Sequence, residues 1–256
     1  VIIKDFFIKL PPLPYEHKMI HILPFFQRLS PLSNAASWDN VGILIPSNIE
    51  NNDKKYLLTI DFTPQVLREC IEKNIKKVIS YHPVLFDAQR NVSLFTAAII
   101  ENRISVFSPH TALDNVMNRT LLSRLGCFDI ETADYMAIGN NGKRMRDIID
   151  LLKMTCNVKE IRLALSDIHR MDSIPPYIYA SVGSGRFSGG ENSIIITGEM
   201  SHHNIMKLKK FNTIMLVEHC RSERWFLNHL KVMMEDSIPD VEVIVSEYDV
   251  SPVSFV

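Results

Sequence analysis

Short apolar runs alternate along the chain with longer stretches whose apolar positions recur at helical spacing. In the first half, this pattern predicts strands within 35–46, over 56–60, and in the runs that end at Ser80 and Ser108. It predicts helices at 20–29, 64–73 and 94–102, and one through Asn118 to Leu125. Thr63 before Pro64 is a typical helix start, and Gly126 is a typical helix end. Alternating strands and helices predict an α/β fold with mainly parallel or mixed sheets.

A second alternation follows residues 131–141, which have little periodicity and end in a turn signal. It predicts helices at 144–153, 201–209 and 222–234, and strands at 161–165, 177–181, 193–197, 241–245 and before His219. We therefore predict two α/β lobes, each a sheet flanked by helices, formed by residues 19–130 and 131–256. Residues 1–18 are apolar but interrupted by charges, and we assign them as an N-terminal extension of uncertain origin.

Three predicted strands are followed by a histidine, and two of these histidines are followed four residues later by a carboxylate. The residues are His82, His110 with Asp114, and His219 with Glu223. Imidazole and carboxylate together suit Zn, Fe, Mn or Ni, and an i,i+4 pair in a first helical turn points both groups the same way. The carboxyl ends of parallel strands gather at the crevice where open α/β sheets bind ligands. One such histidine alone is typical of a backbone-bonded strand end, whereas the set predicts a shared divalent-metal site.

Bulk composition narrows the function classes. With 256 residues, 46% of them hydrophobic, the chain can form ample core for two lobes. A formal net charge of -1, without a basic run interleaved with aromatics, disfavours nucleic-acid binding. No run approaches the ~18 apolar residues that cross a bilayer, and the four cysteines form no C-x-x-C pair. We therefore expect neither nucleic acid nor membrane as a partner, and no thiolate zinc site.

Several short motifs carry a resemblance that covers most of the chain from Met19 onward. They are SWDNVG at 37–42, SYHP at 80–83, SPHTALD at 108–114, GSG at 183–185, TGEMSHH at 197–203 and EHCRSER at 218–224. In order and spacing, these motifs resemble the NIF-three-like family (NGG-one-interacting factor three), whose members are also named GTP cyclohydrolase 1 type 2 homologues. The wording of TGEMSHH and SPHT, and the lack of a long insertion between the halves, resemble its short eukaryotic-type members.

The resemblance implies two α/β lobes with a dinuclear metal centre in the cleft between them, often within a toroidal homohexamer. Carried over residue by residue, it implies two divalent cations, Zn, Fe, Mn or Ni, held by His82, His110, Asp114, His219 and Glu223. Tyr81 stands where many bacterial members have a histidine. Because a phenol is a poor ligand at neutral pH, we expect the two metal positions to be unequal.

The chemistry that such a site favours is hydrolysis, because bound cations can activate water near neutral pH. We therefore expect a metal-dependent hydrolase in the cytoplasm, with mitochondria as a further compartment, whose small-molecule substrate the sequence does not identify. The alternative is a non-enzymatic metal-binding interaction or regulatory protein. Glu199 and His203 follow a predicted strand and are candidate catalytic acid/base or ligand-orienting residues, or else helix-capping residues.

Two of the motifs keep two interpretations each. Trp38 in SWDNVG is a core side chain or a substrate platform, and Asp39 and Asn40 are turn formers or cleft-lining polar groups. The segment 183–185 is a strand-to-loop turn or a place where backbone amides approach a phosphate.

Overall fold

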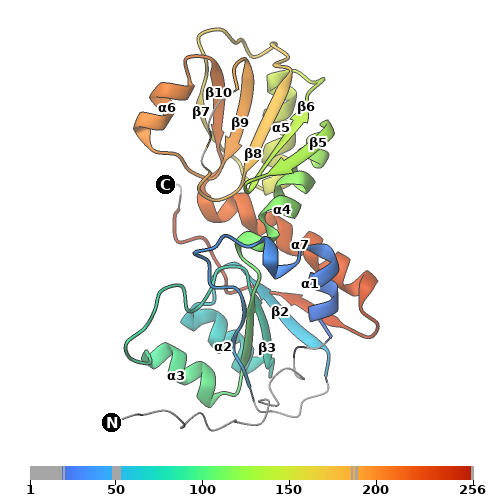
Figure 1. Cartoon of the computed structure of the whole chain (residues 1–256), viewed down its shortest axis with the longest axis vertical. Coiled ribbons are helices and arrows are strands. Elements are labelled where there is room, and N and C mark those ends of the chain that lie inside the picture. The colour runs from blue at the N-terminus through green and yellow to red at the C-terminus, as the bar shows by residue number, and fades with distance from the viewer. Residues whose placement is uncertain (1–18, 20, 48–52, 186, 188–189, 255–256) are drawn as a thin grey trace, which may run out of the picture.

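The chain folds into two lobes stacked along the long axis of the molecule, each built on its own sheet (Figure 1). This computed structural model describes residues 19, 21–47, 53–185, 187 and 190–254. The N-terminal extension predicted at 1–18 lies outside the described residues. The two sheets and their helices confirm the predicted α/β class with mixed sheets.

The sheet of the first lobe has five strands in the order β1-β4-β3-β2-β11. Its strands are β1 (Gly42–Ile45), β2 (Lys55–Thr59), β3 (Lys77–Ser80), β4 (Ser105–Ser108) and β11 (Glu242–Val245). All run parallel except β1, which pairs antiparallel with β4 at one edge. The central strands β2, β3 and β4 are buried along almost their whole length, as expected for a sheet covered on both faces.

The helices that flank this sheet are α1 (Leu23–Leu29), α2 (Pro64–Glu72) and α3 (Leu94–Glu101), with a short 3-10 turn η2 (Leu32–Asn34). Of these helices, α2 and α3 begin where the sequence predicts, and α1 begins at Leu23 rather than at Ile20. The Thr63 side chain accepts a hydrogen bond from the backbone N–H of Val66, which confirms it as the N-cap of α2. α2 and α3 cover one face of the sheet, where Val66 of α2 and Ile99 of α3 pack in one cluster with Val78 of β3.

The sheet of the second lobe has six strands in the order β5-β6-β8-β9-β10-β7. They are β5 (Phe128–Ala133), β6 (Met136–Asn140), β7 (Arg162–Ala164), β8 (Tyr177–Ser181), β9 (Ser193–Thr197) and β10 (Asn212–Leu216). β8, β9 and β10 are parallel, and the outer strands are antiparallel. β5 and β6 form a hairpin where the sequence suggested a lobe boundary at 131–141. Because β5 is mostly exposed on both faces, it carries no apolar alternation that would have marked it as a strand.

Two long helices join the lobes. α4 (Thr111–Arg124) and α7 (His219–Ser237) lie between the two sheets, while α5 (Met145–Cys156) and α6 (His202–Leu208) belong to the second lobe (Figure 1). One continuous core runs from Tyr56 of the first sheet through Phe226 of α7 to Ile194 of the second. Gly126, with φ +81°, ends α4 as predicted.

The predicted second lobe at 131–256 is corrected at both ends. The second sheet already begins at Phe128, and β11 pairs with β2 in the first sheet. The physical reason is α7, which carries the chain from the end of β10 back to the first sheet, where it packs against β2 and β11. A local apolar pattern predicts that 241–245 is a strand but not which sheet it joins.

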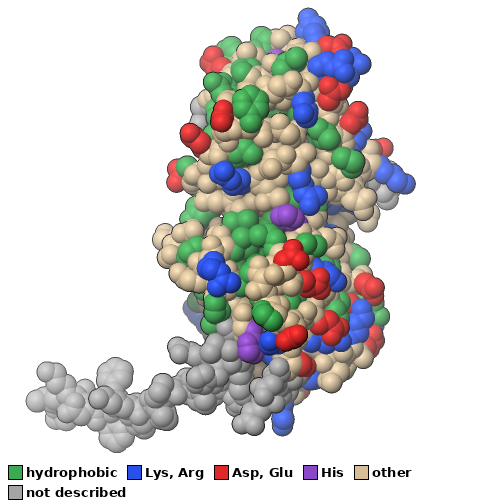
Figure 2. All heavy atoms as spheres, turned by 90° about the vertical axis from the view of Figure 1, so that its right-hand side faces the viewer, with side chains coloured by type: hydrophobic (Ala, Val, Ile, Leu, Met, Phe, Trp, Pro, Cys, Tyr) green, Lys and Arg blue, Asp and Glu red, His purple; other side chains and the backbone are tan. Residues whose placement is uncertain are grey.

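Hydrophobic and charged side chains are distributed over the helices and over one face of the molecule as follows. Among the helices in the described part of the chain, none is long and apolar enough to cross a membrane. Figure 2 shows one long face of the molecule, on which basic and acidic side chains are interspersed.

Candidate metal centre

Strand ends from both sheets meet at the junction of the lobes. In the first sheet, β3 leads to His82 and β4 leads to His110; in the second, β10 leads to His219. Parallel strands place such residues at one edge of their sheet. Glu223 on α7 contacts both His82 and His219, so the two edges face each other across this residue.

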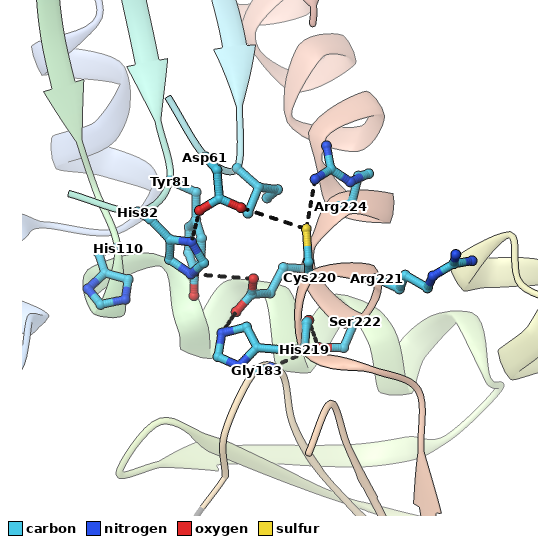
Figure 3. Close-up of polar contacts among 12 residues, drawn as sticks. Asp61, Tyr81, His82, His110, Gly183, His219, Cys220, Arg221, Ser222 and Arg224 are labelled. Carbon is cyan, nitrogen blue, oxygen red and sulfur yellow. Dashed lines mark hydrogen bonds and ion pairs between the residues drawn. The ribbon is translucent and has the colours of Figure 1, made fainter. Parts of the chain in front are cut away.

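His82, His219 and Glu223 form a compact cluster, which we call the metal cluster. Their candidate ligand atoms all lie within 4.8 Å of one another. Nε2 of His82 lies 3.5 Å from Oε2 of Glu223, and Nε2 of His219 lies 3.3 Å from Oε1 (Figure 3). Glu223 is 2% exposed, and it points toward His219 from one turn further along α7.

This spacing suits a divalent cation. Two atoms bound tetrahedrally at ~2.1 Å from a metal lie roughly 3.4 Å apart, which is close to both separations in the metal cluster. Imidazole and carboxylate donors match the ligand preferences of Zn and Fe. Oε2 of Glu223 is buried and accepts no hydrogen bond from the described residues, and a buried carboxylate oxygen of this kind is stabilised by a cation.

Each of the three strand-end histidines has its Nδ1 atom held by a carboxylate. The Nδ1-to-oxygen distances are 2.8 Å for His82 and Asp61, 3.0 Å for His219 and Glu199, and 2.8 Å for His110 and Asp39. A histidine that donates its Nδ1 proton presents Nε2 as the ligand atom, and metal-binding histidines are typically oriented in this way. The three carboxylates therefore orient the histidines.

Opposite charges set the protonation of the metal cluster. Burial alone would lower the pKa of His82, but Asp61 and Glu223 outweigh burial and raise that pKa to about 10. Contact with Glu223 raises the pKa of His219 to about 9, against the effect of burial. Burial alone would raise the pKa of Glu223, but the two histidines bring it below its usual value. At neutral pH the metal-free cluster therefore holds two imidazolium groups around one carboxylate.

His110 and Asp114 lie beside the metal cluster rather than inside it. The ring centroids of His110 and His82 are 5.4 Å apart. Burial lowers the pKa of His110 in spite of its contact with Asp39, so its imidazole is neutral at neutral pH. Asp114 accepts a 2.5 Å hydrogen bond from the hydroxyl of Tyr81, and burial raises the Asp114 pKa to about 7. Of the five predicted ligands, the structure thus joins three in one group and leaves two beside it.

Gly183, from the GSG motif, lies directly against the metal cluster. Its φ is +63°, and a Cβ at this position would lie 2.6 Å from Oε1 of Glu223 and 3.3 Å from Nε2 of His219. Its backbone N–H donates a hydrogen bond to Oγ of Ser222. Gly183 therefore forms a tight turn that leaves room for the ligand side chains, and a larger residue would fill that room.

A cleft of about 740 Å³ opens beside the metal cluster. The first lobe contributes Trp38 and Phe86 to its lining, and the second contributes Asp134, Tyr135 and Ser184. All five predicted ligands line it as well: His82, His110, Asp114, His219 and Glu223. A volume of this size accommodates a small-molecule substrate.

Of the two candidate catalytic residues, only Glu199 touches the metal cluster. Its contact with Nδ1 of His219 supports the ligand-orienting role that the sequence left open. His203 is exposed on α6, where its ring lies 5.8 Å from that of His202, and it does not line the cleft. Sequence reasoning missed Asp61, although it follows the β2 run as closely as His82 follows β3. The same strand-end argument would have found it.

Comparison with known proteins agrees with the fold and the motifs. The model of the Duf34/NIF3 (NGG1p interacting factor 3) family matches residues 17–252. NIF3-like protein 1 of Drosophila melanogaster is 30% identical over 258 residues, which cover 92% of this chain and 88% of that protein. A GTP cyclohydrolase 1 type 2 homolog of Clostridium perfringens is 27% identical over 266 residues, which cover 93% of this chain and 100% of that protein.

A solved structure of a hypothetical protein from Staphylococcus aureus superposes with a TM-score of 0.76 at 20% identity. The superposition covers 92% of this chain and 98% of the other, and at this identity it supports the fold alone. The family model spans nearly the whole chain, and the Drosophila melanogaster relative covers most of it. The chain therefore belongs to the Duf34/NIF3 family.

Proposed function

We propose that this protein binds divalent metal and hydrolyses a small-molecule substrate in the cleft between its lobes. The observation that carries the proposal is the metal cluster, in which the ligand atoms of His82, His219 and Glu223 lie within 4.8 Å of one another. A divalent cation held by these residues would supply Lewis-acid chemistry that activates water near neutral pH. The name of the Clostridium perfringens relative, GTP cyclohydrolase 1 type 2 homolog, agrees with this reaction class.

The neighbouring residues hold the ligands in position for this role. Asp61 and Glu199 accept the Nδ1 protons of His82 and His219, and loss of such a contact typically lowers metal affinity ~10–100-fold. We assign a second, weaker metal position to His110 and Asp114, because both line the same cleft. We expect this position to bind metal weakly because the Asp114 carboxyl accepts a hydrogen bond from Tyr81 and is partly protonated at neutral pH.

Metal analysis and a hydrolase screen on the same preparation test the proposal. We expect at least one divalent ion per chain, and turnover of an ester, phosphoester or cyclic amide that a chelator abolishes and added metal restores. Stoichiometric metal without turnover across the panel would favour the non-enzymatic metal-binding interaction or regulatory protein. A chain that binds no metal would contradict both functions. The homohexamer stays a prediction of the family resemblance, and the location in the cytoplasm, with mitochondria as a further compartment, stays a prediction of the sequence.

Metal binding is expected to release protons and to become tighter as the pH rises. With pKa values of about 10 at His82 and about 9 at His219, both rings are protonated at pH 7 and must lose a proton before Nε2 can bind metal. Calorimetry of Zn²⁺ binding in buffers of different ionisation enthalpy counts these protons, and we expect about two per cation. Affinity should stop rising once the pH passes the two pKa values. Binding without proton release at pH 7 would contradict the paired imidazolium groups.

Tyr81→His is expected to raise the occupancy of the weaker metal position. An imidazole adds a nitrogen ligand where the wild type has a phenol that is hydrogen-bonded to Asp114. We expect the Kd of the second cation to fall by about tenfold, which corresponds to about 1.4 kcal/mol. An equilibrium titration fitted to two sites measures this change, with Tyr177→His, on β8 outside the cleft, as the control. Two indistinguishable high-affinity sites in the wild type would contradict the predicted inequality.

A further inference from the structure

Trp38 and Phe86 form an exposed aromatic pair in the lining of the cleft. Trp38 is 65% exposed, so its interpretation as a core side chain is wrong. Phe86 is 54% exposed, and the two ring centroids lie 6.1 Å apart. Both rings also approach His110, at centroid distances of 6.1 and 6.0 Å and at nearly perpendicular angles. We call Trp38 and Phe86 the aromatic platform.

Exposure alone does not distinguish the aromatic platform. Single exposed aromatic side chains are common on protein surfaces, and this chain also exposes Phe128 and Phe211. The platform differs because its two rings contact each other and line the cavity that holds the candidate metal ligands. Apolar side chains gathered beside a few polar groups in a concave site are typical of small-molecule binding.

Hydrogen bonds tie together the two backbone segments that carry the aromatic platform. Asp39, next to Trp38, accepts hydrogen bonds from Nδ1 of His110 and from the backbone N–H that begins α4. Asn40 donates a 2.6 Å hydrogen bond to the backbone carbonyl that precedes Phe86. Both ring-bearing segments are therefore tied to each other and to α4. Backbone segments fixed in this way lose little conformational entropy when a ligand binds.

The aromatic platform lies next to the metal cluster and shares the cleft with polar groups of the other lobe. His110 is the link, since it contacts both rings of the platform and lies beside His82. The second lobe lines the cleft with Asp134, Tyr135 and Ser184. A ring on the platform can therefore direct one substituent toward the metal cluster and present its polar edge to the second lobe.

We propose that the aromatic platform binds a planar heteroaromatic ring of the substrate by stacking, and so places the reactive group of that substrate at the metal cluster. This inference rests on the proposed function and names its substrate class, a heteroaromatic ring joined to a polar, hydrolysable group. Stacking on an aromatic side chain suits any such ring because each has a π-face, and the gain per ring is about tenfold in affinity.

Adenosine 5′-monophosphate is the probe, and ribose 5-phosphate, which lacks the ring, is its comparison. Trp38 reports binding directly, because Trp225, the other tryptophan, is buried with its indole N–H bonded to the Ser222 carbonyl. We expect the mononucleotide to quench the wild-type fluorescence and to bind about tenfold more tightly than ribose 5-phosphate. By calorimetry, Trp38→Ala and Phe86→Ala should each weaken the binding of the mononucleotide about tenfold and leave the binding of ribose 5-phosphate unchanged. Trp38→Phe should keep most of the wild-type affinity for the mononucleotide.

Phe128→Ala is the matched control, because Phe128 on β5 is also 54% exposed and lies outside the cleft. Three results would overturn the proposal that the aromatic platform stacks on a ring. They are equal affinity of the wild type for the two probes, no mononucleotide binding at millimolar concentration, and unchanged mononucleotide affinity in Trp38→Ala. A Trp38→Ala chain that changes only its oligomeric state would also overturn it, in favour of a contact between copies.

Metal content is measured for every variant, which separates this inference from the proposed function. Platform-dependent mononucleotide binding by a chain that holds no metal would support the aromatic platform and contradict only the metal-dependent hydrolase. A chain that binds metal but fails the ring comparison would contradict the platform and leave the metal cluster standing.

Discussion

Glu223→Gln is expected to remove nearly all divalent metal from the protein while leaving it folded. Glu223 is 2% exposed, and its two oxygens face His82 and His219. The amide keeps the size of the side chain but supplies no negative charge and only one acceptor oxygen. The loss of affinity should exceed the ~10–100-fold drop that follows removal of an outer contact to a metal ligand. Elemental analysis after dialysis without added metal measures the loss.

The fold should tolerate Glu223→Gln because the two histidines can lose their protons. Contact with Glu223 is the largest cause of the raised pKa of His219, so without it the ring becomes neutral more readily and less unpaired charge stays buried. Glu235→Gln, on the same helix and outside the cleft, controls for changes in α7. Wild-type metal content in Glu223→Gln would show that the metal cluster is not the site that binds metal.

Much of the candidate site follows from strand ends, which the sequence alone displays. His82, His110 and His219 each follow an apolar run. The strands before His82 and His110 are parallel neighbours in the first sheet, where such positions meet at one edge, and His219 follows a strand of the second sheet. Glu223 lies four residues after His219 in a first helical turn, where both side chains point the same way. Local patterns suffice to place these residues at strand ends and on one face of α7, whereas the meeting of His82 with His219 depends on how the two sheets face each other.

Pairings between distant segments were not predictable in this way. Tyr81 bonds Asp114 across 33 positions of the chain, and Asp61 and Glu199 orient histidines that follow other strands. Which carboxylate meets which histidine depends on which strands are neighbours, β2 with β3 in the first sheet and β9 with β10 in the second. The exposure of Trp38 likewise depends on what the finished fold leaves uncovered, since an isolated tryptophan in a motif has no periodicity to show its side.

Gly183→Ala is expected to lower metal affinity without changing any ligand residue. At φ +63°, the added Cβ would lie 2.6 Å from Oε1 of Glu223 and 3.3 Å from Nε2 of His219. Glu223 must then turn away from the metal cluster, or the turn after β8 must move. We expect metal affinity to fall by at least about tenfold, and the free energy of unfolding to fall by about 1–2 kcal/mol from backbone strain. Metal titration and chemical denaturation measure the two effects.

Gly126→Ala separates crowding of the metal cluster from backbone strain. Gly126 also has a positive φ, +81°, but it lies beyond the end of α4 opposite to Asp114, and its added Cβ would meet the flexible end of Lys143. This variant should lose similar stability and keep its metal. Metal loss in both variants would point to general destabilisation, and metal loss in neither would exclude crowding at Gly183. Loss of metal in Gly183→Ala alone would show that the GSG turn is part of the metal site, because this turn leaves space for the Glu223 side chain.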